Sequence, residues 1–364
     1  MLKIAFSAAL LGLLYSQVDW SRVAPLLGNV GPWAFAALLA LYTANRILMA
    51  LKWHQLLHVL DKRLSRPGAI RVYYESSFVG FAMPLGGLGP DIVRYLRLRG
   101  RGIASHITLV SIIVERYVGL IATLAVVVFG ALTFAAIAPE PALAGFARLT
   151  AAGALAAAVG AAVVLLVPRA RRGARRLIAR SRKLEAKIAK HTAAASTYST
   201  RRGVLVANFG LSLLEQTTPI WSYWIGSRAL DTPLPLAVCI AVAPIVVVVQ
   251  RLPISYGGLG LREGSAAALL VALGYDYSEA MVMLMLLFVM FFVSLLPGAV
   301  IFKRSPPPAE AAIEQPSATA LSRAPTAAAV DAASGPLTGA VAPATPAAGA
   351  VSSPRACGRA PETG

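Results

Sequence analysis

The sequence predicts an all-α protein, a polytopic helix bundle embedded in a membrane with six to eight membrane helices. Hydrophobic residues make up 57% of the chain and charged residues only 14%, whereas a soluble domain carries roughly 25% charged residues. The mean hydropathy is +0.68. Long apolar runs recur at about the ~20 residues that a helix needs to cross a bilayer. These observations together exclude an ordinary soluble domain.

The apolar runs define the expected membrane helices. They cover residues 4–14, 33–51, 121–137, 151–167, 234–249 and 281–302. The first run could instead be a cleaved signal peptide, because Lys3 precedes a short apolar core. No small-x-small cleavage site follows it, and further apolar runs come directly after. A retained first helix is therefore the preferred interpretation.

Basic residues predict the orientation of the chain. The formal net charge is +18, and lysine and arginine gather in residues 52–71, 94–101, 169–202 and 303–304. The connections at residues 19–31, 139–144 and 231–235 are poor in basic residues. Such alternation follows the positive-inside rule. It places the N-terminus in the cytoplasm and accounts for the charge without a nucleic-acid partner.

Two segments stand outside the apolar pattern. In residues 169–202, Leu177, Leu184 and Ile188 recur near helical spacing, so this basic stretch is either an interfacial helix on the inner leaflet or a solvated loop. Residues 305–364 are rich in Pro, Ala and Ser and lack aromatic residues, which is typical of disorder. We therefore expect a transmembrane domain at residues 1–304 and a disordered tail at residues 305–364.

A glycine-rich break interrupts the apolar pattern at MPLGGLGPDIVRYLRLRG, residues 83–100. Basic residues flank residues 72–93 on both sides, so this segment need not cross the membrane and is better explained as a re-entrant or broken helix. Glycines at 86, 87 and 89 would allow a turn whose N–H groups approach an anion at a helix start. With Arg94 close by, the break is either a cradle for a phosphate headgroup or a structural hinge.

A second copy of the motif, RLPISYGGLGLREG, occupies residues 251–264. It repeats the order of proline, GGLG and charges of both signs, although chance similarity of glycine-rich turns is an alternative. Interrupted hydrophobic segments in corresponding halves point to the central site of a transporter. We therefore expect two re-entrant or broken segments that form an internal repeat and face one cavity.

Charged residues inside the apolar runs support a polar cavity, because each is costly in lipid and must face protein or water. Arginine suits phosphate through its planar fork, so Arg94, Arg251 and Arg262 are expected to meet a headgroup. The alternative is that Glu115 with Arg116, and Arg262 with Glu263, form ion pairs that fix helix packing. The carboxylates in or beside the spans are Glu75, Asp91, Glu115, Glu215 and Glu263.

Two rival classes of protein are less well supported. A membrane-embedded enzyme would need a metal set or an acid–base pair, but the chain has four histidines and two cysteines. His54 and His58 lie at a span end without a nearby acidic cluster, so we interpret them as interfacial residues. An accessory or scaffold protein would need no polar cavity. We expect no catalytic residue, no metal and no cofactor, and no ATP-binding motif is present.

The motifs resemble the flippase-like transmembrane domain of the lysylphosphatidylglycerol synthetase family. The matching pieces are NRILMALKWHQLL, MPLGGLGPDIVRYLRLRG, VERYVGL and LPISYGGLGLREG, which occur in family order across most of residues 1–304. The resemblance implies a bacterial inner-membrane protein that moves or holds a lipid between leaflets. The aminoacyl-transferase domain of full-length relatives is not present in this sequence, so we do not expect lipid aminoacylation.

The implied partners are membrane lipids with anionic headgroups, and a homo-oligomer or a partner in envelope-lipid synthesis is possible. The residues expected to bind the headgroup come from the two glycine motifs and the intramembrane charges. They are Arg46, Gly86, Gly87, Gly89, Asp91, Arg94, Glu115, Arg116, Arg251, Gly257, Gly258, Gly260, Arg262 and Glu263.

Overall fold

A computed structural model describes residues 2–28, 30–83, 86–166, 197–198, 201–252 and 254–304. The predictions for residues 169–202 fall almost entirely outside these ranges, and the predicted tail at residues 305–364 falls entirely outside them. Within the described residues every regular element is a helix and no strand occurs, so the all-α prediction is confirmed.

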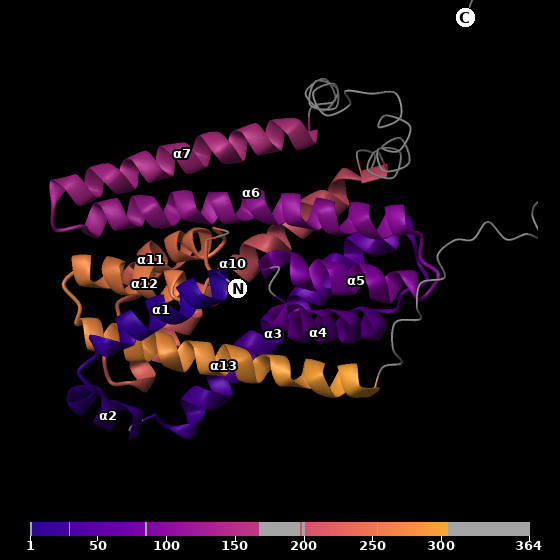
Figure 1. Cartoon of the computed structure of the whole chain (residues 1–364). Coiled ribbons are helices and arrows are strands. Elements are labelled where there is room, and N and C mark those ends of the chain that lie inside the picture. Colours follow the sequence, from indigo (N-terminus) through magenta and orange to yellow (C-terminus); the bar gives the residue numbers. More distant parts are fainter. Residues whose placement is uncertain are drawn as a thin grey trace, which may run out of the picture. The chain divides into compact units, whose positions relative to one another are not determined.

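The helices follow one another in the order shown in Figure 1. They are α1 (Leu2–Ser16), α2 (Trp20–Gly28), α3 (Pro32–Leu60), α4 (Arg66–Ala82), the 3-10 helix η1 (Gly86–Leu88), α5 (Gly89–Arg99), α6 (Ser105–Ile137), α7 (Pro141–Leu166), α10 (Arg202–Ala229), α11 (Leu236–Val249), α12 (Leu261–Ala272) and α13 (Tyr277–Arg304).

Four of the described helices are long and apolar enough to cross a membrane. They are α3, α6, residues Pro141–Val163 of α7, and α13, and shorter apolar helices occur at Ile4–Ser16 and in α11. Helix α10 is 28 residues long, but polar residues interrupt its apolar pattern. A polytopic membrane bundle is therefore confirmed.

Helices α4 and α5 form a hairpin, called here the first hairpin. Glu75 of α4 forms an ion pair with Arg97 of α5, and Gly80 lies against Pro90, so the two helices run antiparallel from the break between them. They contain 17 and 11 residues. At about 1.5 Å per residue neither reaches across a hydrocarbon core of about 30 Å. The broken segment therefore folds back toward its starting side.

Helices α11 and α12 form a second hairpin around the second glycine motif. They contain 14 and 12 residues, so each is again too short to span. In Figure 1 the first hairpin lies toward the right and the second toward the left, between the long helices α6 and α13. The hydroxyl of Tyr256 donates to the carbonyl oxygen of Phe81 at 2.9 Å. The ends of the two hairpins are thus in contact.

Small residues allow the helices to approach closely. A Cβ at Gly130 of α6 would lie 2.8 Å from the carbonyl oxygen of Ile240 in α11. A Cβ at Gly298 of α13 would lie 2.3 Å from that of Tyr74 in α4. Close backbone contact at glycine is a common way to pack membrane helices. The long helices α6 and α13 are therefore each fitted against one hairpin.

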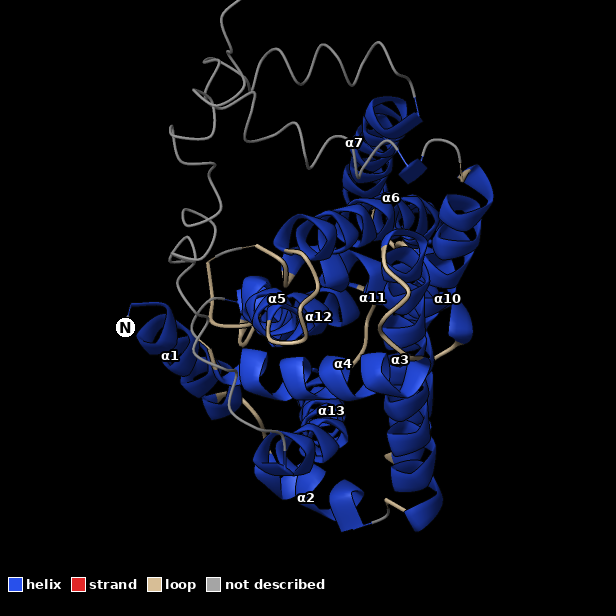
Figure 2. Ribbon diagram, turned by 90° about the vertical axis from the view of Figure 1, so that its right-hand side faces the viewer, coloured by secondary structure: helices blue, strands red, loops and turns tan. Residues whose placement is uncertain are grey.

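The main apolar cluster lies among α10, α11, α12 and α13, with contributions from α1 to α3. A second cluster surrounds Trp53 and Tyr73 at α3, α4 and α5. Figure 2, which turns the view by 90°, shows α7 outside α6. Side chains such as Phe146 and Leu149 of α7 are exposed, as expected of a helix that contacts lipid.

Candidate functional site

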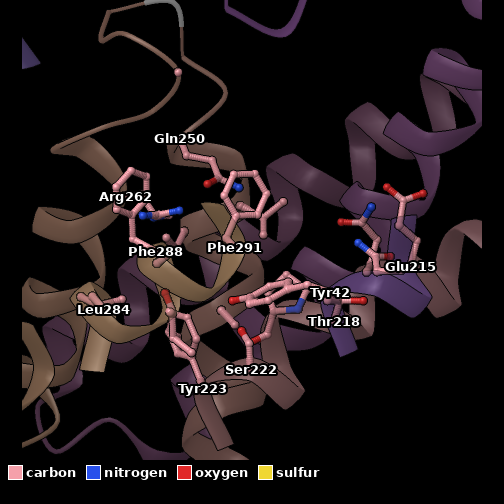
Figure 3. A pocket seen from close by; sticks show the side chains of 18 of the residues that line it. Tyr42, Glu215, Thr218, Ser222, Tyr223, Gln250, Arg262, Leu284, Phe288 and Phe291 are labelled. Carbon is pink, nitrogen blue, oxygen red and sulfur yellow. The ribbon is translucent and has the colours of Figure 1, made fainter. Parts of the chain in front are cut away.

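A cavity of about 330 Å³ lies between α3, α10, the second hairpin and α13. We call it the central cavity. Its walls include three arginines, Arg46, Arg251 and Arg262, and one carboxylate, Glu215. Figure 3 shows Arg262 beside Phe288 on one side and Glu215 on the other, with Phe291 between them. The site therefore combines aromatic rings with an excess of cationic groups.

Arg46 projects from the middle of α3. Its Nη1 donates to the hydroxyl of Ser77 at 3.3 Å, and its guanidinium carbon lies 5.0 Å from the centre of the Phe291 ring. Arg46 makes no ion pair with any described residue. A ring face and a hydroxyl compensate only part of the cost of a charge at membrane depth. Arg46 thus has capacity left for an anion.

Arg251 follows α11 and is held by a neutral partner. Its Nη1 donates to the hydroxyl of Thr123 in α6 at 2.9 Å, and it too forms no ion pair with the residues that the structure describes. Arg262, in the first turn of α12, is different because its Nε donates to Glu263 at 3.0 Å. Its guanidinium carbon also lies 5.2 Å from the Phe288 ring centre. Two of the three cavity arginines therefore have no carboxylate partner in the described part of the chain.

The single carboxylate of the cavity is already paired. Glu215 of α10 forms an ion pair with Lys52 of α3, whose side chain is only 3% exposed. The sequence placed Lys52 in a basic flank, and this was wrong, because Lys52 is buried in the bundle. Since Lys52 balances Glu215, the three arginines give the central cavity a positive charge, partly offset by Glu263 beside Arg262. Such a cavity favours anions.

Arg46 and Glu215 were identified from the sequence, but the polar residues beside them in the wall were missed. On α3 the cavity residues Tyr42, Asn45, Arg46 and Met49 follow one another at helical spacing, and on α10 so do Glu215, Thr218, Pro219 and Ser222. Residues spaced by three, four and seven lie on one face of a helix. This periodicity of polar residues within membrane helices is the signal that could have found them.

The second glycine turn borders the central cavity. Gly257, Gly258 and Gly260 have φ values of 60°, 84° and 82°, a region that favours glycine. Gly257 lines the cavity. The backbone N–H of Gly260 donates to Glu263 at 2.8 Å, so the carboxylate of α12 itself occupies this donor. The backbone cradle expected here is therefore filled by Glu263.

The first glycine turn has a different conformation and a different neighbourhood. Neither Gly87 nor Gly89 has a positive φ. Asp91, in the first turn of α5, accepts from Arg116 Nε at 3.0 Å and from Nη2 at 2.9 Å. Arg116 also donates to the carbonyl oxygen of Gly87 at 3.0 Å. The turn is thus fixed by contacts within the protein.

Arg94 lies at the centre of this charge network and is 1% exposed. It pairs with Asp91 and donates to Glu115 at 2.6 Å, and its guanidinium carbon lies about 5 Å from the rings of Trp53 and Tyr73. It does not line the central cavity. Its contacts indicate that Arg94 holds α3, α4, α5 and α6 together.

The two expected ion pairs have different outcomes. Arg262 does pair with Glu263. Glu115, however, pairs with Arg94, and Arg116 pairs with Asp91. Consecutive residues of a helix point about 100° apart, so Glu115 and Arg116 reach different sides of α6. The expected pairing between them was wrong, although both residues do fix helix packing.

The predicted headgroup residues therefore divide into three groups. Arg46, Arg251, Gly257 and Arg262 line the central cavity. Gly258, Gly260 and Glu263 build the second turn behind it. Gly86, Gly87, Gly89, Asp91, Arg94, Glu115 and Arg116 lie in or beside the first turn. Gly87, Gly89 and the four charged residues do not line the cavity, but the two turns are joined through Tyr256 and Phe81.

Together these features define a class of protein, a helical membrane protein with two re-entrant hairpins and a cationic cavity. The chain matches the family described as the lysylphosphatidylglycerol synthase TM region over residues 1–298. It belongs to this family, as its motifs indicated, and the family points to a function connected with membrane lipids. Comparison with curated proteins gives no match.

Proposed function

We propose that the protein moves an anionic phospholipid, or another envelope lipid of like charge, between the leaflets of the bacterial inner membrane. The observation that carries this proposal is the pair of cavity arginines, Arg46 and Arg251, that have no carboxylate partner among the described residues. Both lie at membrane depth, where an uncompensated charge is costly. A phosphate group supplies the missing counter-charge and accepts the paired hydrogen bonds that a guanidinium offers.

The size of the central cavity fits a headgroup rather than a whole lipid. Its volume of about 330 Å³ is near the lower end of the range of roughly 300–1,000 Å³ for small-molecule pockets. The acyl chains would stay in the bilayer. Phe81, Phe288 and Phe291 would contact the apolar part of the lipid next to the headgroup.

The two hairpins supply the parts that could open the cavity. They approach from opposite ends of the long helices, and their ends meet at the hydrogen bond between Tyr256 and Phe81. Broken helices at a repeat interface are typical of alternating access. Separation of the hairpins at this contact would expose the central cavity to one side.

We also propose that the chain is not itself an enzyme. The carboxylate that lines the cavity, Glu215, is held by Lys52, so it is not free to act as an acid or base. The alternatives are a membrane-embedded lipid-modifying enzyme and an accessory protein of an envelope-lipid pathway. Each alternative predicts a result in the lipid-movement assay that differs from the result we propose.

The test uses purified protein in vesicles that contain phosphatidylglycerol or phosphatidylcholine with a fluorescent acyl chain. An impermeant quencher reports the lipid that reaches the outer leaflet. We expect faster movement of phosphatidylglycerol than in empty vesicles, and at least a tenfold loss of this rate in the double variant Arg46→Gln/Arg251→Gln. Arg71→Gln is the control, because Arg71 is exposed on α4 and does not line the cavity.

Three results would contradict the proposal. Movement equal to that in empty vesicles would favour an accessory protein. If the double variant moved phosphatidylglycerol as fast as the wild type, the cavity arginines would have no part in lipid movement. A chemically changed lipid, detected by mass spectrometry, would favour the enzyme.

A further inference from the structure

A second cavity, called here the rim cavity, lies at the basic ends of α3 and α10 and has a volume of about 820 Å³. It is built from the last turns of α3, the link to α4, the first residue of α4 and the start of α10. Its lining shares no residue with the central cavity. It is therefore a separate feature that the proposed lipid movement does not use.

Cationic groups from three parts of the chain meet at the rim cavity. Lys62, Arg66 and Arg201 line it together with His54 and His58. None of the described residues that line it is acidic. Lys62, Arg66 and Arg201 form no ion pair with any described residue.

The nearest carboxylate in the link to α4 is already used. Arg63 Nε donates to both oxygens of Asp61, at 3.1 and 3.0 Å, and these hydrogen bonds lower the pKa of Asp61. Asp61 does not line the rim cavity. The positive charge of the cavity is therefore uncompensated within the described part of the chain.

Backbone donors add to this charge. Helices α4 and α10, of 17 and 28 residues, both begin at the rim cavity, and the start of a helix carries partial positive charge. The start of α4 is capped by the hydroxyl of Ser65. At α10, in contrast, the N-cap residue Arg201 makes no side-chain capping hydrogen bond. The N–H of Val204 donates to the carbonyl oxygen of Arg201, and the N–H groups of Arg202 and Gly203 have no acceptor among the described residues.

Two polar side chains of α3 indicate that something further binds here. His54 is 8% exposed, and its Nε2 lies 2.9 Å from the carbonyl oxygen of Leu64. Because a carbonyl only accepts, Nε2 carries the proton, and Nδ1 has no described partner. The buried Oε1 of Gln55 also has no hydrogen-bond partner in the structure. Both atoms are acceptors, so a hydroxyl of the lipid headgroup, and not the phosphate itself, would satisfy them.

The remaining lining is apolar, which distinguishes a lipid from a free anion. Apart from Ser65, this part of the wall consists of Leu51, Val59, Leu64, Val204 and Leu211, and α3 is one of the candidate spans. A cavity at the end of such a helix lies at the level of the headgroups. Its apolar wall and cationic groups match the glycerol region and the phosphate of a phospholipid.

We propose that the rim cavity binds the phosphate group of an anionic phospholipid from the leaflet on the basic side of the membrane. Lys62, Arg66, Arg201 and the start of α10 hold the phosphate, and the apolar wall contacts the glycerol and first acyl carbons. The bound lipid joins α3, α4 and α10 and so fixes the base of the first hairpin.

The test counts bound lipids by native mass spectrometry on the full chain in detergent. The variant Arg46→Gln/Arg251→Gln serves as the background, so that lipid in the central cavity does not contribute. We expect one phosphatidylglycerol to remain bound in this background. Adding Lys62→Gln, Arg66→Gln and Arg201→Gln should weaken its binding at least tenfold, because each basic group near the surface contributes to the attraction.

The matched control adds Arg71→Gln, Lys303→Gln and Arg304→Gln instead, which removes the same charge from exposed positions outside the cavity. It should keep the lipid. Equal loss in this control, or no loss in the rim variant, would overturn the proposal. Glycerol phosphate binding as tightly as phosphatidylglycerol would also overturn it, because the site would then take a soluble phosphate. None of these outcomes depends on whether the protein moves lipid.

Discussion

The arginines of this protein differ in their partners, and the partners indicate their roles. Arg94 is buried between two carboxylates and two aromatic rings. Among the described residues Arg46 contacts only a hydroxyl and a ring, although it lies deep in α3. A buried charge needs a full set of partners. The arginines with an incomplete set, Arg46 and Arg251, are therefore the ones that can bind a headgroup.

The ion pair between Lys52 and Glu215 gives a prediction about stability. Lys52→Met should lower the free energy of unfolding by up to roughly 3 kcal/mol, because it leaves the half-buried Glu215 carboxylate, 12% exposed, without its partner. The double variant Lys52→Met/Glu215→Gln should recover most of this loss, since neither charge remains. Thermal unfolding in detergent measures both. A double variant as unstable as the single one would contradict this explanation.

Two glycines of the first turn should respond differently to alanine. A Cβ at Gly89 would lie 2.5 Å from the carbonyl oxygen of Gly80, whereas no described atom lies within 4 Å of a Cβ at Gly87. Gly89→Ala should therefore cost ~1–3 kcal/mol through overpacking. Gly87→Ala should change stability by no more than about 0.5 kcal/mol. Melting temperatures of the two variants provide the comparison, and equal values would be evidence against a tight hairpin.

At the scale of single residues, part of the central cavity could be predicted from the sequence. Arg46, Arg251 and Arg262 could be identified because a charge within an apolar run is costly and conspicuous. Arg94 is just as conspicuous, but its burial and its carboxylate partners depend on how four helices pack, which no local pattern contains. Tyr42 and Ser222 were missed because a single hydroxyl in a membrane helix does not by itself indicate a cavity. The helical spacing between the polar residues of each helix was needed to identify them.

At the scale of elements, the two GGLG motifs have the same sequence, but their glycines have different structural roles. In the first, Gly89 allows the backbone to approach Gly80 of the same hairpin. In the second, Gly257, Gly258 and Gly260 adopt positive φ. The sequence could predict two breaks, because glycine and proline interrupt helices. It could not predict the conformations, which depend on the neighbouring chain.

Helix α6 is longer than the apolar pattern of the sequence predicts. The apolar run starts at residue 121, but α6 starts at Ser105. Glu115 and Arg116 interrupt the apolar pattern without interrupting the helix, since Arg94 and Asp91 of α5 neutralise them. Hydropathy therefore gives a minimum length for a helix whose charges are paired by another element.

The contact between the two hairpins gives a prediction about their dynamics. Tyr256→Phe removes the hydrogen bond to the carbonyl of Phe81, a contribution of about 1 kcal/mol. We expect faster amide hydrogen exchange in residues 78–90 and 254–262 and a changed rate of lipid movement. Amide hydrogen exchange of the protein in detergent is measured by mass spectrometry.

Tyr277→Phe is the matched control for this variant. The Tyr277 hydroxyl also donates to a backbone carbonyl at 2.9 Å, that of Leu14 in α1, but this bond does not involve the first hairpin. Its loss should speed exchange near α1 and leave residues 78–90 unchanged. Unchanged exchange at both hairpin ends in Tyr256→Phe would mean that this contact does not hold them closed.

At the scale of the whole membrane domain, the directions of the two hairpins can be related to the distribution of basic residues. The first hairpin opens toward the basic ends of α3 and α13, and the second opens toward the end where α6 joins α7 (Figure 1). The two short hairpins thus enter from opposite faces and meet at the central cavity. A headgroup held there has one hairpin between it and each side of the membrane, as alternating access requires.

The last prediction concerns the orientation of this arrangement. By the positive-inside rule the ends of α3 and α13 face the cytoplasm, and the connection between α6 and α7 faces outward. In a chain whose two cysteines are replaced by alanine, Glu140→Cys and Lys303→Cys occupy exposed positions at these opposite ends. An impermeant maleimide should label the cysteine at 140 in intact cells and the one at 303 only after permeabilisation. Labelling at 303 alone in intact cells would reverse the orientation, and the rim cavity would then take its lipid from the outer leaflet.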